Sequence, residues 1–142
     1  LGILITLFVF FFQAEDGIRD LIVLEFRRVL FRSGGGQCPI LYTPGSSVTL
    51  TGDVTYYEVK AESGNAVKRG FCSACGSPIC ILAELVPDLI GLWAGSLDDP
   101  DQFNPQINVW TASAPRWFVL DTRLSSCPHA PSNETFQNLL TS

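Results

Sequence analysis

The stretch that decides the fold is RGFCSACGSP, residues 69–78. Cys72 and Cys75 are three positions apart and Gly76 follows them. This is the pattern of a zinc knuckle, in which a tight turn directs two thiolates at one point and the glycine tolerates a positive φ. Soft sulfur ligands favour zinc or an iron-sulfur cluster over magnesium or calcium. One Cys-x-x-Cys supplies only two ligands of a tetrahedral site, so the other ligands must come from elsewhere.

The segments on both sides of this stretch have the composition of short β-strands. We expect residues 66–71 to enter the turn as a strand and residues 78–82 to leave it. A hairpin turn at Gly64 and Asn65 should connect residues 66–71 to the preceding strand. Other expected strands are residues 40–42, 48–50, 54–59, 89–95 and 107–110. With no long helical period and no internal repeat, the chain from residue 34 onward is predicted to be a small, mainly β, single domain.

Composition and charge limit the classes of function. The chain has 142 residues, 46% of them apolar and 16% charged, and its formal net charge is −5. These values are typical of a globular protein. Lys and Arg form no patch after residue 33, which argues against nucleic-acid binding. The 5 cysteines, without a recognisable secretory signal, favour a reducing compartment, so a cytoplasmic location is predicted.

The first 33 residues differ in character from the rest. Residues 1–12, LGILITLFVFFF, are apolar but shorter than the roughly 20 residues of a membrane span, so no membrane association is predicted. QAEDGIRD (13–20) and FRRVLFRS (26–33) resemble a translated sequencing adapter. We therefore interpret residues 1–33 as a non-native leader. Residues 14–31 mix apolar and charged residues at helical spacing, and part of this range is expected to form a helix.

In sequence order, the knuckle, the GSLDDP block at 95–100, Pro105 and Trp110 resemble the family of glutathione-dependent formaldehyde-activating enzymes and centromere protein V-like proteins. The resemblance covers residues 34–124, and its most specific part is FCSACGS. It implies a β-tent fold around a structural zinc held by four cysteines, two of which match Cys72 and Cys75. It also implies a catalytic zinc held by a Cys-x-Cys-x-x-Cys motif just before residues 34–36. An open zinc position there would bind glutathione as the thiolate that attacks an aldehyde.

The sequence departs from this family pattern at the metal ligands. It contains no Cys-x-Cys, and no cysteine precedes Cys38. We therefore interpret residues 34–124 as a partial domain whose N-terminal part is missing. Cys72 and Cys75 would form a structural zinc half-site, while a catalytic zinc and catalytic residues are not supported. Residues 125–142 are expected to be a C-terminal tail with a short helix at 132–140.

Four other residues are candidates to complete the metal site. Cys38 lies beside the glycines, although a lone buried cysteine is a common core residue. Cys80 stands between two isoleucines, and we favour packing in a strand. Cys127 and His129 could form a Cys3His site with the knuckle, although they lie in a Pro- and Ser-rich tail. Since His129 is the only histidine, no Ser-His-Asp or Cys-His catalytic set is supported.

Aromatic residues on the expected strands could line a small pocket, but packing in the core is their more common role. We therefore expect core positions for Tyr56, Tyr57, Trp93, Trp110 and Trp117.

Three functions are compatible with the sequence. The first is a zinc-binding carbon-sulfur lyase or synthase acting on adducts of glutathione, or another small thiol, with formaldehyde. The second is a zinc-stabilised, non-catalytic binding or scaffold module of the same fold. The third, which we favour for this polypeptide, is an inactive fragment of the first, because the cysteines of the catalytic zinc are absent from the sequence.

Overall fold

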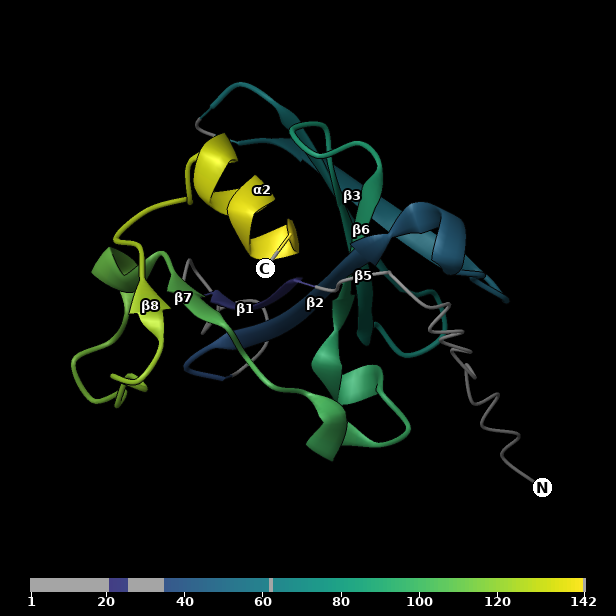
Figure 1. The fold of residues 1–142 in the computed structure, drawn as a ribbon. Coiled ribbons are helices and arrows are strands. Elements are labelled where there is room, and N and C mark those ends of the chain that lie inside the picture. The colour runs from purple at the N-terminus through teal and green to yellow at the C-terminus, as the bar shows by residue number, and fades with distance from the viewer. Residues whose placement is uncertain (1–20, 26–34, 62, 142) are drawn as a thin grey trace.

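The structure, a computed structural model, describes residues 21–25, 35–61 and 63–141. The strands in these residues are β1 Leu21–Glu25, β2 Cys38–Pro44, β3 Val54–Lys60, β4 Ala66–Cys72, β5 Pro78–Ala83, β6 Leu89–Trp93, β7 Ile107–Val109 and β8 Ser125–Ser126. They form one 8-stranded sheet in the order β3-β4-β5-β6-β2-β1-β7-β8 (Figure 1). The predicted mainly β class is confirmed.

One half of the sheet, β3 to β6, is a series of antiparallel neighbours in chain order. The turn between β3 and β4 is closed by the Ala61 N–H, which donates to the Asn65 carbonyl at 2.8 Å, and Gly64 has a φ of 86°. The Cys-x-x-Cys turn connects β4 to β5, and the pairing register of these strands shifts between Gly70 and Phe71. The strands expected at 54–59, 66–71, 78–82 and 89–95 are confirmed, although the last ends at Trp93.

The other half of the sheet pairs strands that are distant in the sequence. β2 is antiparallel to both β6 and β1, whereas β7 is parallel to both β1 and β8. Trp110 follows β7 with a left-handed φ of 60° and turns the chain away from the sheet. The strands expected at 40–42 and 107–110 are confirmed, and β2 extends further in both directions than predicted.

Two expectations about secondary structure are wrong, and a third is tested only in part. In the range 14–31, part of which is expected to be helical, residues 21–25 form β1, because pairing with β2 and β7 outweighs the helical spacing there; the rest of that range lies outside the described residues. Residues 48–50 are not a strand but follow the 3-10 turn η1, Gly45–Ser47. Residues 125–126, expected in the C-terminal tail and outside any strand, form β8. Although β1 precedes the proposed boundary after residue 33, it belongs to the same sheet as the residues that follow.

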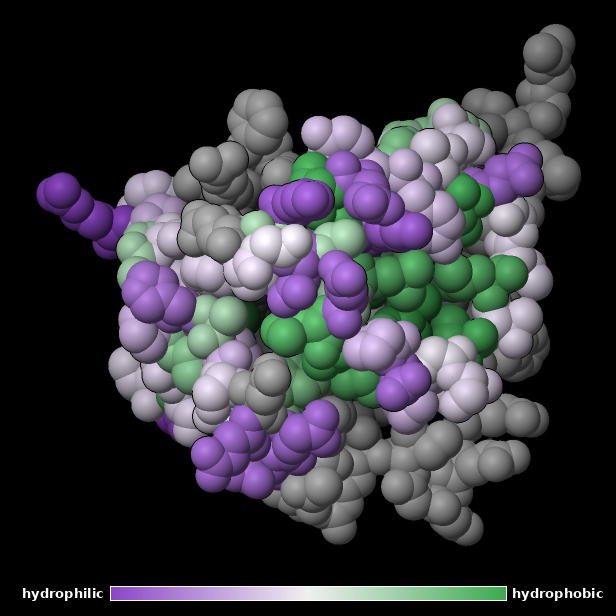
Figure 2. All heavy atoms as spheres, turned by 90° about the horizontal axis from the view of Figure 1, so that it is seen from above, coloured by the Kyte–Doolittle hydropathy of each residue, from purple (hydrophilic) through white to green (hydrophobic). Residues whose placement is uncertain are grey.

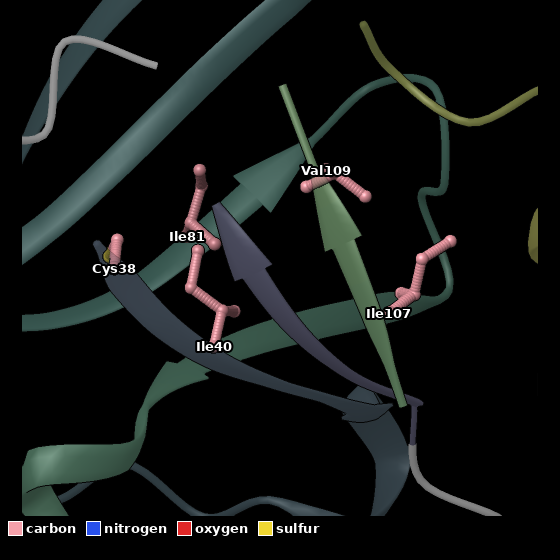
Figure 3. Packing of buried hydrophobic residues seen from close by; sticks show 5 residues of the cluster. All are labelled: Cys38, Ile40, Ile81, Ile107 and Val109. Carbon is pink, nitrogen blue, oxygen red and sulfur yellow. The ribbon is translucent and has the colours of Figure 1, made fainter. Parts of the chain in front are cut away.

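Two clusters of buried side chains form the core. The first cluster comes from β2, β5 and β7 and consists of Cys38, Ile40, Ile81, Ile107 and Val109 (Figure 3). The second cluster comes from β5 and β6 and consists of Ile79, Cys80, Ile90 and Leu92. Successive side chains of a regularly paired strand point to opposite faces of a sheet, so Cys80 and the adjacent Ile81 place the two clusters on opposite faces. Ile79 lies at the register shift in β5 and joins the cluster of Cys80.

The helix α2, Asn133–Thr141, covers the face of the first cluster (Figure 1). Phe136 and Leu139 pack against this cluster, and the Phe136 ring meets Tyr42 edge to face at 5.6 Å between ring centroids. Ser132 Oγ accepts a hydrogen bond from the Thr135 N–H at 3.1 Å and caps the helix. The helix expected at 132–140 is therefore confirmed. Among the described residues, no helix is long and apolar enough to cross a membrane.

Several large side chains remain on the surface. One face carries a continuous apolar area bordered by polar residues (Figure 2). The exposed large apolar side chains are Tyr56, Tyr57, Leu85, Trp117 and Val119. The core expectation is therefore wrong for Tyr56, Tyr57 and Trp117, because β3 is at the edge of the sheet and residue 117 lies outside the strands. Trp93 and Trp110 pack, partly buried, against the first cluster.

Candidate functional site

The Cys-x-x-Cys turn has a backbone shape fixed by hydrogen bonds. The Gly76 N–H donates to the Cys72 carbonyl at 2.9 Å, and the Cys72 N–H donates to the Ser77 carbonyl at 2.9 Å. Gly76 has a φ of 74°, as the knuckle pattern predicts. A Cβ at this position would have no neighbour within 4 Å, so the backbone angle, and not lack of space, favours glycine. The turn therefore presents its two cysteines in a defined arrangement at the end of β4.

The two thiols of the turn differ in their surroundings. Cys72 is half-buried and packs against the second cluster, whereas Cys75 is exposed. Cys75 Sγ donates a hydrogen bond to Ser77 Oγ at 3.3 Å. Hydrogen bonds with the Ser77 side chain and backbone, and then with the Cys72 side chain, lower the pKa of Cys75 because they stabilise its thiolate. The thiolate is the form that binds metal and attacks electrophiles.

The chemistry of these donors fits half of a zinc site. Two sulfur ligands from one turn suit zinc, which takes four ligands in a tetrahedral structural site. In residues 21–25, 35–61 and 63–141, no group of three or more His, Cys, Asp and Glu residues could hold a metal ion. The described residues thus offer the turn alone, with Cys72 and Cys75 as its two sulfur donors.

Cys38 and Cys80 are both core residues. Cys38 is 5% exposed in the first cluster, and Cys80 is fully buried in the second. Burial raises the pKa of Cys80, because it disfavours the charged thiolate. The packing role favoured for Cys80 agrees with this position. Cys38 lies on the opposite face from the cluster that Cys72 contacts, so the structure does not bring it to the turn.

Cys127 and His129 lie beside β7. The Cys127 N–H donates to the Asn108 carbonyl at 2.8 Å, and the Trp110 N–H donates to the His129 carbonyl at 3.2 Å. The rings of Trp110 and His129 meet edge to face at 6.0 Å. Four strands, β5, β6, β2 and β1, separate β4 from β7 in the sheet. The suggested Cys3His site with the knuckle is therefore not formed, because the tail is anchored at the other end of the sheet.

Asn108 is a buried polar residue that the sequence analysis did not single out. It is fully buried on β7, and its Nδ2 donates to the Asp121 carbonyl at 3.0 Å and to Ser126 Oγ at 3.2 Å. These bonds attach the chain after β7 to the sheet. The sequence pattern that could have indicated this role is an amide residue between two apolar residues of a short strand. A buried amide at such a position needs hydrogen-bond partners.

An open depression of about 400 Å³ lies at the other end of β4 from the thiols. Its charged lining residues have partners of their own: Lys68 Nζ is 3.3 Å from Glu58 Oε2, and Glu84 Oε2 accepts from the Ala66 N–H at 2.7 Å. Ala66 is the first residue of β4 and Cys72 the last. A molecule bound in this depression would therefore not reach the turn.

The fold and the turn together define a small, mainly β domain with a two-thiol turn between neighbouring strands. Residues 32–113 match the glutathione-dependent formaldehyde-activating enzyme family. This match covers more than half of the 142 residues and includes the turn, so the chain belongs to that family. A comparison with curated proteins found no match. β8 and α2 follow the matched range.

Proposed function

We propose that this domain derives from a zinc-binding carbon-sulfur lyase or synthase that acts on adducts of a small thiol with an aldehyde. The family is described by glutathione and formaldehyde, so the thiol and the aldehyde of the proposal are this pair. The observation that carries the proposal is the two-thiol turn inside the matched range, where Cys72 and Cys75 would supply two ligands to a structural zinc. When bound, such a zinc would tie the end of β4 to the turn that precedes β5 and stabilise the fold.

For the 142-residue polypeptide itself, we propose that turnover is absent and zinc binding is weak. The support is the distribution of cysteines: none precedes Cys38, and no Cys-x-Cys occurs in the sequence. Nucleophilic attack by a zinc-bound thiolate needs an open zinc position, which the family pattern places before residue 34. The turn supplies two sulfur ligands, Cys72 and Cys75, whereas a structural zinc site takes four.

The experiment is a zinc titration and an activity assay on the purified polypeptide. We expect less than one zinc per chain after dialysis and no consumption of formaldehyde in the presence of glutathione. The double variant Cys72→Ser, Cys75→Ser should lose the residual zinc. Cys127→Ser, a half-buried cysteine beside β7, is the matched control and should retain it.

The outcomes separate the candidate functions. Tight zinc at one per chain together with turnover would overturn the proposed inactivity. Tight zinc without turnover would favour the non-catalytic, zinc-stabilised module. Zinc that remains bound in the double variant would show that the turn is not the metal site.

A further inference from the structure

We propose that Cys72 and Cys75 form a redox-active dithiol, which reacts with small-molecule disulfides such as glutathione disulfide and closes into an intramolecular disulfide. This activity uses the same two sulfurs as the proposed zinc site. It does not depend on that proposal, because it needs neither a metal nor a third ligand.

The backbone of the turn has the geometry that a disulfide requires. A disulfide needs Cα atoms about 4.4–6.8 Å apart. The Gly76 N–H donates to the Cys72 carbonyl at 2.9 Å and closes a single helical turn over residues 72–76, in which residues three positions apart are neighbours on the same side. Cys72 is the first residue of this turn and Cys75 lies within it, so both sulfurs belong to one closed turn. The disulfide can thus form without rearrangement of β4 or β5.

The difference in exposure assigns separate roles to the two sulfurs. Thiol-disulfide exchange depends on access to the attacking sulfur. Cys75 is exposed and Ser77 Oγ holds its sulfur at 3.3 Å, so it is the attacking residue. Cys72 is half-buried against the second cluster and belongs to the same turn as Cys75, so it is the resolving residue.

The reaction is a balanced exchange of two electrons. The Cys75 thiolate attacks one sulfur of glutathione disulfide, which forms a mixed disulfide and releases one glutathione thiolate. The Cys72 thiolate then attacks the Cys75 sulfur, forms the Cys72–Cys75 bond and releases the second glutathione. The protein dithiol is oxidised, the small disulfide is reduced, and the two thiol protons pass to the two released glutathione molecules through solvent.

The remaining cysteines provide internal controls. Cys38 is 5% exposed and Cys80 is fully buried, on opposite faces of the sheet. Cys127 is half-buried against the first cluster. The structure therefore predicts that oxidation under native conditions is selective for the turn.

The experiment exposes the reduced, chelator-treated polypeptide to glutathione disulfide. The protein is then unfolded in denaturant, the free thiols are alkylated and the cysteines are mapped by mass spectrometry. We expect the intact protein to lose two hydrogens, with Cys72 and Cys75 joined and the other cysteines alkylated.

In Cys72→Ser the resolving thiol is absent, so a glutathione adduct should accumulate on Cys75. In Cys75→Ser, oxidation should be slower by about tenfold or more, because only the half-buried thiol remains. Cys127→Ser is the matched control and should react like the unaltered protein.

Three results would overturn the proposal: no Cys72–Cys75 bond at a large excess of glutathione disulfide, an adduct that forms equally on the buried cysteines, or unchanged oxidation of Cys75→Ser. Circular dichroism of each variant identifies loss of fold, and the unaltered protein tests the disulfide without any substitution. Saturating zinc should slow the oxidation if both reactions share the sulfurs. Oxidation that is unaffected by zinc would contradict the zinc half-site and leave the dithiol reaction supported.

Discussion

The two halves of the sheet are built in different ways. In β3 to β6 each strand pairs with the next along the chain, through short turns that include the Cys-x-x-Cys turn. In β2, β1, β7 and β8 most pairings join distant segments, and two of them are parallel. Local pairing depends on turn residues close in sequence, whereas distant pairing depends on matching buried surfaces. The strand pairing in the half that carries the thiols is therefore determined by short segments of sequence. The pairing in the other half requires contacts between segments that are far apart in the chain.

The two faces of the sheet are covered by different kinds of segment. Val48 and Leu50, in an irregular stretch, pack on the second cluster. Phe136 and Leu139 of α2 pack on the first. The segment over the second cluster lies within the range matched to the family, whereas α2 lies beyond it. The first cluster is thus completed by a segment outside the family match.

The largest expected effect tests whether the two halves unfold together. Leu92→Ala in the second cluster and Ile107→Ala in the first should each lower the free energy of unfolding by about 2–5 kcal/mol, because each removes a fully buried side chain. β2 pairs with β6 and joins the halves, so both variants should show one shared transition in urea, followed by circular dichroism and tryptophan fluorescence. Leu85→Ala, at an exposed position, should change stability by less than about 0.5 kcal/mol. Two separate transitions would mean that the halves are independent units.

The next effect concerns close packing in the locally paired half. A Cβ at Gly70 would lie 2.5 Å from Cys80 Sγ and 2.9 Å from Val54 Cγ1. Gly70→Ala should therefore lower the free energy of unfolding by about 1–3 kcal/mol through overpacking. Gly95→Ala is the matched control, since its Cβ would meet nothing within 4 Å. Denaturation midpoints of both variants check this, and equal stability would show that Cys80 moves aside easily.

A smaller effect is expected at the helix that covers the first cluster. Phe136→Ala removes the edge-to-face contact with Tyr42 and part of the cover over the cluster. Because Phe136 is only half-buried, we expect a loss of about 1–2 kcal/mol, below the ~3–5 kcal/mol of a fully buried phenylalanine. The measurement is thermal unfolding, with Val119→Ala, 88% exposed, as the control. No change in stability would mean that α2 does not support this half of the sheet.

The smallest effect is electrostatic and lies in the segment after β7. Hydrogen bonds from the Arg123 side chain, and then from its backbone, lower the pKa of Asp121 to about 2. This folded-state pKa lies below the ordinary aspartate pKa of 3.8, so the carboxylate stabilises the fold above about pH 4, and the contribution is lost as pH falls through about 2. Arg123→Ala should raise the Asp121 pKa toward its ordinary value, measured by carboxyl NMR titration. Lys68→Ala, on β4, should leave it unchanged; an unaltered pKa in Arg123→Ala would contradict the pairing.

The locally paired half was well predicted from the sequence, and so was the turn. Gly64, Gly76 and the strands around them follow from turn chemistry and alternation, which act over a few residues. The rest was not predictable in this way. Residues 21–25 become a strand because β2 and β7 flank them, and residues 48–50 leave the sheet although their composition suits a strand.

The candidate site, like the fold, was predictable from the sequence only in part. The sequence by itself determined the Cys72-x-x-Cys75 turn and the family, because spacing, the positive φ of Gly76 and the flanking strands are local properties. Only the tertiary structure decided which other cysteines could reach it. Cys38, Cys80 and Cys127 are placed by their burial in two clusters on opposite faces of the sheet, and burial depends on pairings between strands far apart in the chain. For the same reason, only the folded chain shows that Cys75 is exposed while Cys72 is held against the core.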